Sequence, residues 1–437
     1  MPFGKHLNDM RELMVVKRFQ NRFMHKRRSV VEHMGSTAMI SHWLCIFEKE
    51  LFGTKVDVAE VLQRAINFNS TQFKTGNILN SNNKLTPSMK EAKQTIKEIA
   101  YRDYIEKTLP KSWTKDFERY IINAKDSSVE GRIIQAADLI DTILECIEEI
   151  RLHNKETFEI VLRETVESLM SVKLMSVDYV IKYILPKFKL DDRYYGDNLV
   201  NYRDNIKLNN CDISLMESFS ISGEYMYQYR NLMDLMRYQN KYMFKRTSVV
   251  EHMWSVAKIS QGLSIWMKDK FNVDVNLEKV LCTALAHDFS EFITGDILST
   301  TKRMTNRMKE AVDEMEKVAF KHQIEALIPK EVRCDFEQYI LYPKDDGVEG
   351  KIIAAADIID TIYECAGEVK LGNNEIFGEI LKKVTKSLLS VKLEAVDYFL
   401  IHSLKDVGLD DIEKYYGEEV YNYIQTINED DRFKPQI

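Results

Sequence analysis

The chain contains two copies of one long segment, and this duplication constrains its fold more than any other feature. Residues 18–41, "RFQNRFMHKRRSVVEHMGSTAMIS", align with residues 237–260, "RYQNKYMFKRTSVVEHMWSVAKIS", at an offset of 219 residues. The same offset places "VEGRIIQAADLIDTI" at 129–143 on "VEGKIIAAADIIDTI" at 348–362. Solenoid repeats are only about 20–45 residues long, so a period of this length indicates a duplicated domain. We therefore predict two domains of the same fold.

The boundaries of the two copies follow from this alignment. We predict a first domain over 1–205, a linker over 206–219 and a second domain over 220–437, because the polar stretch "NIKLNNCDIS" separates the copies. Two copies of one fold can pack about an approximate two-fold axis, as the subunits of a homodimer do. We expect an intramolecular pseudo-dimer of this kind.

The hydrophobic periodicity of both copies is helical. In "LIDTILECIEEIRL", residues 139–152, the apolar positions recur at the three- and four-residue spacing of one helix face. The stretch "VAKISQGLSIWM" at 256–267 does the same. The chain has only 7 Pro and 16 Gly in 437 residues, and strand-like alternation is scarce. We therefore predict an all-α fold.

Composition and charge exclude several classes of protein. With a net charge of -7 and an isoelectric point near 5.9, general adhesion to nucleic acid polymers or anionic membranes is not expected. No apolar run reaches the roughly 18 residues of a membrane span, and the polar start "MPFGKHLNDMRE" lacks the apolar region of a signal peptide. The 6 cysteines form no CxxC pair and are interpreted as reduced thiols. We expect a cytoplasmic protein with no membrane or nucleic acid partner.

One segment differs in charge between the copies. In the second copy "ALAHDFSEFITGD" at 284–296 lies opposite "AINFNSTQFKTGN" at 65–77 in the first. On a helix, Glu291 would lie one turn from His287 and Asp288 on the same side. Because the neighbouring residues are apolar, we expect these groups on an otherwise buried helix, where ionisable side chains need partners or a metal.

Two further residues complete a candidate metal site in the second copy. His252 follows the Glu of "SVVEHM", and Asp357 lies in the small-residue run "AAADIID". Two His and two Asp suit Mn, Co, Fe, Ni or Zn better than Ca or Mg. Each residue alone has a structural explanation, since His252 could be a hydrogen-bonded core histidine and Asp357 a helix cap or ion-pair partner. Their joint order, H…HD…D, favours one divalent transition metal.

This order resembles that of the HD-domain metal-dependent phosphohydrolases, all-helical enzymes named for the His-Asp pair. Within them, "HDFSEFITGD" and the Arg-Tyr pair fifteen residues before His252 resemble the 5′-deoxynucleotidase family, which hydrolyses 5′-deoxynucleoside monophosphates to deoxynucleosides and phosphate. The resemblance covers nearly all of each copy. It implies two tandem HD-domain helical bundles, packed as a pseudo-symmetric pair, and a small-molecule nucleotide as substrate.

The resemblance also implies a role for each residue that matches the family pattern. It implies that the metal ligands are His252, His287, Asp288 and Asp357. Glu291 takes the position of the catalytic carboxylate, Asp296 that of the group reading the sugar 3′-hydroxyl, and Arg237 that of the phosphate-contacting arginine.

Two substrate-binding positions are weaker matches. Tyr238 stands where the family has a Trp that crowds the ribose 2′-position, and this departure bears on selectivity for deoxy sugars. Lys302 is a candidate second phosphate contact, against which a solvated lysine is the simpler interpretation.

The first copy has lost the charged set. Phe68 stands opposite His287, and three amide residues stand opposite carboxylates of the second copy: Asn69, Gln72 and Asn77. Amides keep the shape and remove the charge, which relieves repulsion where no metal is bound. His33 and Asp138 persist, but two ligands hold a hydrolytic metal poorly. We expect a metal-free copy that supplies a packing surface for the second. A non-hydrolytic nucleotide site is the alternative, because Arg18 and Phe19 keep the phosphate and sugar positions.

The leading hypothesis is a metal-dependent phosphohydrolase that removes the 5′-phosphate from (deoxy)nucleoside 5′-monophosphates, with its active site in the second copy only. One alternative is an HD phosphohydrolase acting on a nucleoside triphosphate, an alarmone or a cyclic nucleotide. Asp296 speaks against a cyclic or 3′-linked substrate, which lacks the free 3′-hydroxyl that this residue would read. Another alternative is a nucleotide-binding regulator with weak catalysis.

Overall fold

The computed structural model describes residues 3–78, 86–208, 212–297 and 305–434. Every regular element in these ranges is a helix, and their strand-like pairing is limited to two isolated bridges, Lys17 with Ser29 and Met236 with Ser248. The predicted all-α class is therefore confirmed. A search of the same residues found no helix with the length and apolar character of a membrane span.

Each copy is built around two long helices that pack against each other. In the first copy these are α2 (Val30–Ile46) and α7 (Val129–Arg151), and in the second they are α13 (Val249–Asp269) and α19 (Val348–Lys370). Shorter helices cover each pair: α3 (Val58–Ala65) and α8 (Lys155–Met170) in the first copy, α14 (Leu277–Ala284) and α20 (Asn374–Leu388) in the second.

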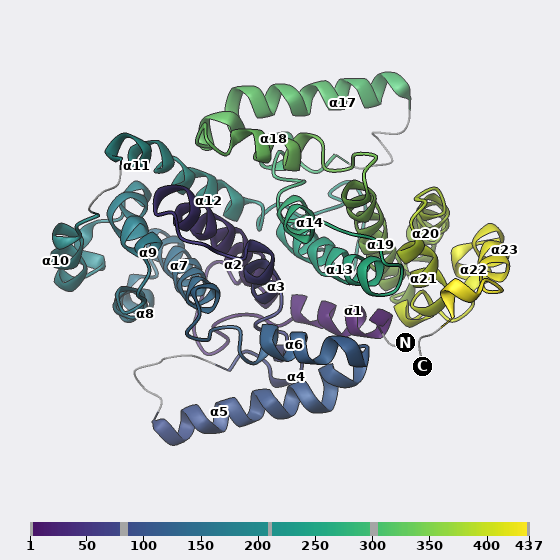
Figure 1. Ribbon diagram of the computed structural model, residues 1–437, viewed down its shortest axis with the longest axis horizontal. Coiled ribbons are helices and arrows are strands. Elements are labelled where there is room, and N and C mark those ends of the chain that lie inside the picture. The colour runs from purple at the N-terminus through teal and green to yellow at the C-terminus, as the bar shows by residue number, and fades with distance from the viewer. Residues whose placement is uncertain (1–2, 79–85, 209–211, 298–304, 435–437) are drawn as a thin grey trace.

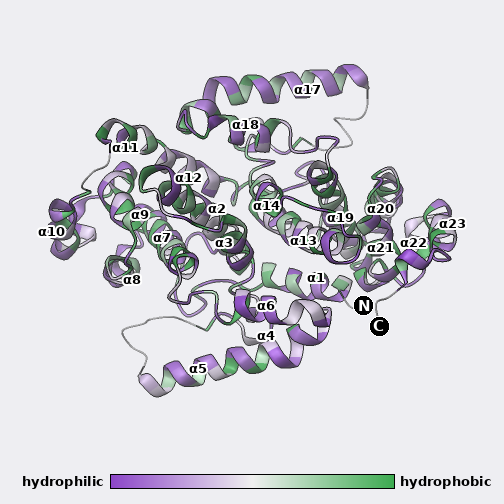
Figure 2. Cartoon of the chain, in the orientation of Figure 1, coloured by the Kyte–Doolittle hydropathy of each residue, from purple (hydrophilic) through white to green (hydrophobic). Residues whose placement is uncertain are grey.

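The remaining helices surround these cores. In the first copy they are α1 (Phe3–Arg11), α4 (Gln72–Thr75), α5 (Pro87–Ala100), α6 (Thr114–Ile121), α9 (Met175–Tyr179) and α10 (Asp197–Asn205). Helix α11 (Ile213–Phe219) lies between the copies, and in the second copy the helices are α12 (Ser222–Asn231), α15 (Glu291–Thr294), α17 (Asn306–Ala319), α18 (Arg333–Leu341), α21 (Glu394–His402), α22 (Ile412–Tyr416) and α23 (Glu418–Ile427). Figure 2 shows the hydrophobic residues gathered on the central helices, whereas α5 and α17 are largely hydrophilic and lie at the outer edges of the molecule.

The first core helix of each copy starts at the same local signal. Ser29 caps α2 and Ser248 caps α13, and each serine forms a reciprocal capping box with a glutamate three residues later, Glu32 or Glu251. Such a box satisfies backbone N–H groups that have no partner inside the helix. Nearly all residues of both helices are buried, as expected for helices that are packed on every side.

The two copies meet where α2 lies against α13 and α3 against α14 (Figure 1). The backbones approach closely, because a Cβ on Gly35 would stand 2.7 Å from a methyl group of Val250. Polar contacts cross the same interface: the hydroxyl of Ser29 donates to Glu251 at 2.6 Å, and the indole N–H of Trp254 donates to the carbonyl of Ile66 at 3.2 Å.

The N-terminal helix of each copy packs on the other copy. Helix α1 lies beside α13 (Figure 1), where the ring of Phe3 meets that of Trp266 edge-on at 4.9 Å. Helix α12 lies beside α2, where Tyr225 meets Trp43 edge-on at 5.4 Å. Each copy is thus completed by a segment of the other. The domain boundaries stay a prediction, and α11 (Ile213–Phe219) forms within the predicted linker.

Candidate active site

Four elements of the second copy carry the predicted site residues. His252 lies in the first turns of α13, and Asp357 lies in the middle of α19, so Asp357 is not a helix cap. His287 and Asp288 do not lie on a helix, contrary to the prediction, but in the turn between α14 and α15. Glu291 is the buried first residue of α15.

The helix ends before the His-Asp pair in the second copy, as α3 ends at the equivalent residue of the first copy, and the ring of His287 contacts this helix end. Its Nδ1 donates to the carbonyl oxygen of Ala284 at 2.9 Å, taking up an acceptor at the end of α14. The following amides form tighter contacts three residues back, from Phe289 to Ala286 and from Glu291 to Asp288. The turn therefore brings the side chains of the pair toward α13, where a regular helix would have spread them along one face.

The geometry of the two histidines leaves one nitrogen of each for a ligand. His252 Nδ1 lies 2.6 Å from Asp360 Oδ2 and 2.9 Å from Arg237 Nη1, and because the carboxylate of Asp360 is ionised and can only accept, Nδ1 donates to it. His287 Nδ1 donates to a carbonyl, so each ring carries a proton on Nδ1. Both Nε2 atoms are buried and make no hydrogen bond to the described residues. An unpaired buried nitrogen is costly, whereas a lone pair at that position is what a metal ion binds.

The donor atoms of the predicted ligands converge around these nitrogens. One donor atom each of His252, His287 and Asp288 lies within 4.8 Å of the other two. Asp288 Oδ2 is 3.3 Å from both Nε2 atoms. Asp357 Oδ1 is 3.3 Å from His252 Nε2, and its other oxygen pairs with Lys344 Nζ at 2.5 Å. This mixed imidazole and carboxylate set fits a divalent transition metal.

Charge and burial oppose each other in this cluster. Burial would raise the pKa of Asp288, but the neighbouring His287 and His252 bring it well below its ordinary value. Burial lowers the pKa of His287, which keeps the ring neutral as a metal ligand requires. Burial would likewise raise the pKa of Asp360, but Arg11 first and His252 next hold it below its usual range.

Arg237 and Tyr238 lie on the loop that precedes α13. Arg237 Nη1 pairs with Glu364 at 2.5 Å and with Asp360 at 3.4 Å, and its side chain keeps 13% exposure. Within the described part of the chain, Nη1 makes all the hydrogen bonds and ion pairs found for this guanidinium. Nη2 and Nε therefore remain for a ligand.

Asp296 has a structural contact that the sequence did not predict. The backbone N–H of Tyr238 donates to Asp296 Oδ2 at 2.8 Å, and Tyr238 has a left-handed φ of 56°. A non-glycine residue in this region needs support from its surroundings. Asp296 supplies it, because it links the end of the TGD segment to the loop of Arg237. Lys302 lies outside the residues that the structure describes.

Sequence reasoning missed the groups that surround the ligands, namely Asp360, Glu364, Lys344 and Arg11. A signal for the first was available, since "AADLID" and "AADIID" keep a second Asp three residues after the first in both copies. The same signal was available for Arg11, since Arg230 stands at the equivalent position of the second copy, but its contact with Asp360 joins residues 349 positions apart.

The matching position of the first copy lacks the second histidine. Phe68 replaces the second histidine and meets the ring of His33 edge-on at 5.7 Å. His33 Nε2 is 2.8 Å from Asp138 Oδ1, so the nitrogen that would bind a metal is already engaged. Lys125 pairs with Asp138 and lies 4.9 Å from the centre of the Phe68 ring. Across the described ranges, the search for metal-binding groups returned only the cluster in the second copy.

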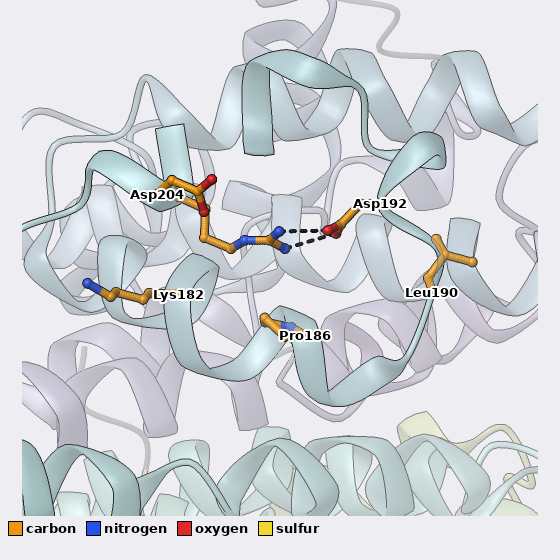
Figure 3. A pocket seen from close by; sticks show the side chains of 6 residues that line it. Lys182, Pro186, Leu190, Asp192 and Asp204 are labelled. Atoms are coloured by element: carbon orange, nitrogen blue, oxygen red, sulfur yellow. Dashed lines mark hydrogen bonds and ion pairs between the residues drawn. The ribbon is translucent and has the colours of Figure 1, made fainter. Parts of the chain in front are cut away.

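A hollow of about 720 Å³ lies elsewhere, on the surface of the first copy (Figure 3). It contains none of the predicted site residues, and its lining consists of Lys182, Pro186, Leu190, Asp192, Arg203 and Asp204. Arg203 donates to both oxygens of Asp192, at 2.9 and 2.7 Å, and both residues line the hollow. Its main charges are thus neutralised within the chain, and it is no candidate for the active site.

A helical bundle whose core presents His252, His287 and Asp288 around one point defines a metal-dependent phosphohydrolase of the HD class. The sequence profile described as "5'-deoxynucleotidase YfbR-like" matches twice, over residues 5–188 and 224–407. The chain therefore belongs to the YfbR-like 5′-deoxynucleotidase family, and it is a hydrolase built from two tandem HD-type helical bundles.

Individual relatives agree with the family. A 5′-deoxynucleotidase of Yersinia pestis (strain Pestoides F) is 30% identical over 173 residues, which are 38% of this chain and 87% of that protein. A 5′-deoxynucleotidase of Yersinia pseudotuberculosis serotype O:1b (strain IP 31758) matches to the same extent. Among solved structures, an HD-domain phosphohydrolase from Listeria innocua is 30% identical, with a TM-score of 0.42, and covers 46% of this chain and 97% of its own.

Proposed function

We propose that the protein removes the 5′-phosphate from (deoxy)nucleoside 5′-monophosphates and that only the second copy is catalytic. One contrast carries this proposal. In the second copy Nε2 of His252 and of His287 make no hydrogen bond to the described residues and lie 3.3 Å from Asp288, whereas in the first copy Phe68 replaces one histidine and His33 Nε2 lies 2.8 Å from Asp138. A hydrolytic site needs open coordination, and the second copy alone offers it among the described residues.

The metal ligands in this proposal are His252, His287, Asp288 and Asp357. Which of Mn, Co, Fe, Ni or Zn occupies the site is left to experiment. A bound divalent metal supplies charge neutralisation at the phosphate and a lower pKa for water. Phosphomonoester hydrolysis is extremely slow without a catalyst, so this contribution is needed.

The chain's own groups bind the substrate and move the proton. Arg237 offers Nη2 and Nε as a fork to two phosphate oxygens. Glu291, buried at the start of α15, takes the proton of the attacking water. Asp296 uses the oxygen that Tyr238 does not occupy to accept the 3′-hydroxyl, and a sugar without this hydroxyl would leave that carboxylate oxygen unpaired.

The two copies act together in this proposal as the intramolecular counterpart of a homodimer. The exchanged helices α1 and α12 support it, because equivalent helices cover opposite copies. The first copy is then a packing partner that has lost its own chemistry.

The test is phosphate release from a panel of 5′-deoxy- and ribonucleoside monophosphates by metal-stripped protein, resupplied with Mn, Co, Zn or Mg one at a time. We expect metal-dependent release of phosphate and nucleoside in wild type and loss of turnover in Asp288→Ala. The matched control is Asn69→Ala, the same position in the first copy, which should stay active. Release that needs no metal would contradict the proposal, as would equal loss in both variants. Pyrophosphate or triphosphate as product from other nucleotides would point to another substrate class.

A further inference from the structure

We propose that Arg11, a residue of the first copy, is a positioning residue of the metal site in the second copy. It fixes the carboxylate of Asp360 and, through it, the ring of His252. This inference rests on the proposed function of the second copy and deepens it. It gives the degenerate copy a defined part in the catalytic site beyond general packing.

The fold delivers Arg11 to the second copy by way of helix α1. Phe3 lies so close to Gly262 of α13 that a Cβ there would stand 2.0 Å from its ring. The hydroxyl of Tyr363, on α19, donates to the carbonyl of Gly4 at 2.9 Å. These contacts anchor the helix at its start, and Arg11 is its last residue. The direction of α1 therefore carries the guanidinium to the space between α13 and α19.

Arg11 and His252 hold opposite oxygens of one buried carboxylate. Arg11 Nη1 pairs with Asp360 Oδ1, and the same nitrogen donates to the hydroxyl of Ser255 at 2.9 Å. Asp360 Oδ2 accepts from His252 Nδ1 at 2.6 Å. The side chain of Asp360 is 1% exposed, so water does not compete for either oxygen. With both oxygens held, the carboxylate cannot turn, and the His252 ring keeps Nε2 aimed at the other ligands.

If Arg11 were removed, Arg237 would be the cation that remains beside Asp360, and it would compete with His252 for this carboxylate. Arg237 Nη1 is 3.4 Å from Asp360 Oδ2, the oxygen that His252 uses, and it already pairs more closely with Glu364. Without Arg11 the carboxylate is free to turn toward Arg237 and away from the histidine. Outer partners of this kind orient metal-binding histidines, and losing one typically lowers metal affinity about 10- to 100-fold.

The first copy contains the same arrangement and provides a natural control. Arg230, at the equivalent position in α12, pairs with Asp141 and donates to Glu148 at 3.0 Å. Asp141 Oδ2 is 2.6 Å from His33 Nδ1. The side chain of Arg230 is 1% exposed, compared with 13% for that of Arg11. Its loss should destabilise the fold at least as much as the loss of Arg11, but it serves a histidine that has no metal site.

The experiment compares Arg11→Ala with Arg230→Ala in the full chain, after metal removal and titration with Co²⁺. We expect Arg11→Ala to bind Co²⁺ about 10- to 100-fold more weakly, with an altered visible absorption band. Arg230→Ala should lose thermal stability yet keep its Co²⁺ affinity and spectrum. Equal loss of affinity in both variants would reduce Arg11 to a structural role, and wild-type affinity in Arg11→Ala would overturn the proposal.

A double-mutant cycle tests whether Arg11 acts through Asp360. Asp360→Asn should weaken Co²⁺ binding. Adding Arg11→Ala should then have little further effect, because the relay, the contact of Arg11 with His252 through Asp360, is already broken. Additive effects would contradict the relay. If Arg11→Ala does not fold, Arg11→Lys replaces it, since it keeps the charge but not the planar geometry of a guanidinium.

Failure of this inference is distinguishable from failure of the proposed function. Wild-type protein that binds Co²⁺ and releases phosphate, with Arg11→Ala unchanged, would refute the inference alone. Wild-type protein that binds Co²⁺ but hydrolyses no nucleotide would refute the function while leaving the relay to be judged from the titrations. Wild-type protein that binds no Co²⁺ would refute both.

Discussion

The substitution His287→Phe should make the metal-free protein more stable and abolish its response to metal. It copies into the second copy the residue that stands at the same position in the first, Phe68, which is 3% exposed beside His33. The ring fits, because the centroids of His252 and His287 are 5.4 Å apart and those of His33 and Phe68 are 5.7 Å apart. The variant thus tests stability and function against each other.

The magnitude follows from two opposing contributions. The variant removes a buried Nε2 that makes no hydrogen bond with the described residues, a penalty of about 1–3 kcal/mol. It also loses the hydrogen bond from Nδ1 to Ala284, worth about 0.5–1.5 kcal/mol. The variant also loses the attraction of His287 for Asp288, which lowers the pKa of that carboxyl, and this loss reduces the gain. The net gain is roughly 1 kcal/mol, or about 2–4 °C in Tm for a unit of 150–250 residues.

With metal bound, wild type should become more stable than His287→Phe. A ligand that binds only the folded state at 100 times its Kd stabilises wild type by about 2.7 kcal/mol, and His287→Phe should gain nothing. The assay is thermal unfolding of both proteins in chelator and in excess Co²⁺ or Mn²⁺. The mirror variant Phe68→His is the control, and it should lower stability without creating metal binding, because Asn69 still lacks a charge. Metal that stabilises His287→Phe as much as wild type would refute the reasoning, as would a metal-free variant less stable than wild type.

Three further changes have expected outcomes. Burial, and next the charge of Glu32, raises the pKa of Glu251 to about 7. Folding therefore becomes less favourable as pH rises from about 4.5 to 7, and Glu251→Gln should gain up to about 3 kcal/mol over wild type between pH 5 and pH 8. Urea unfolding measures this gain, and a difference independent of pH would contradict it. Burial lowers the pKa of Lys258 to about 7, so wild type should gain stability relative to Lys258→Met as pH rises from 7 to 9, by roughly 1.4 kcal/mol per pH unit. If urea unfolding gives the same difference in stability between wild type and Lys258→Met at pH 7 and at pH 9, the expectation for Lys258 is wrong. Tyr238→Trp should raise the ratio of kcat/KM for deoxy- over ribonucleoside monophosphates by about 10-fold or more, and an unchanged ratio would remove this position from sugar selection.

Much of the fold was predictable from the sequence because its signals are local. Helical periodicity shows which residues share a face, and the serine–glutamate pairs mark the starts of α2 and α13. The same local rule failed at His287 and Asp288. The spacing of these residues suited a helix, but the chain turns after Ala284, as it does after Ala65 at the equivalent position of the first copy.

The composition of the candidate site was also predictable, whereas its supporting contacts were not. The order His, His-Asp, Asp predicted four candidate ligands, and the structure brings donor atoms of His252, His287 and Asp288 within 4.8 Å of one another. Asp296 was predicted only as a sugar-binding residue, although its contact with Tyr238 also supports a strained loop. This second role depends on a left-handed φ angle that no residue type announces in advance.

The sequence by itself determined that the chain has two copies of one helical unit and that only the second keeps a charged metal set. Repeats, periodicity and residue identity are properties of neighbouring positions, so they can be read along the chain. Only the tertiary structure decided that α1 packs on the second copy and α12 on the first, and that Arg11 reaches Asp360 across the interface. Contacts between residues hundreds of positions apart depend on which surfaces bury each other, and that is settled when the whole chain packs.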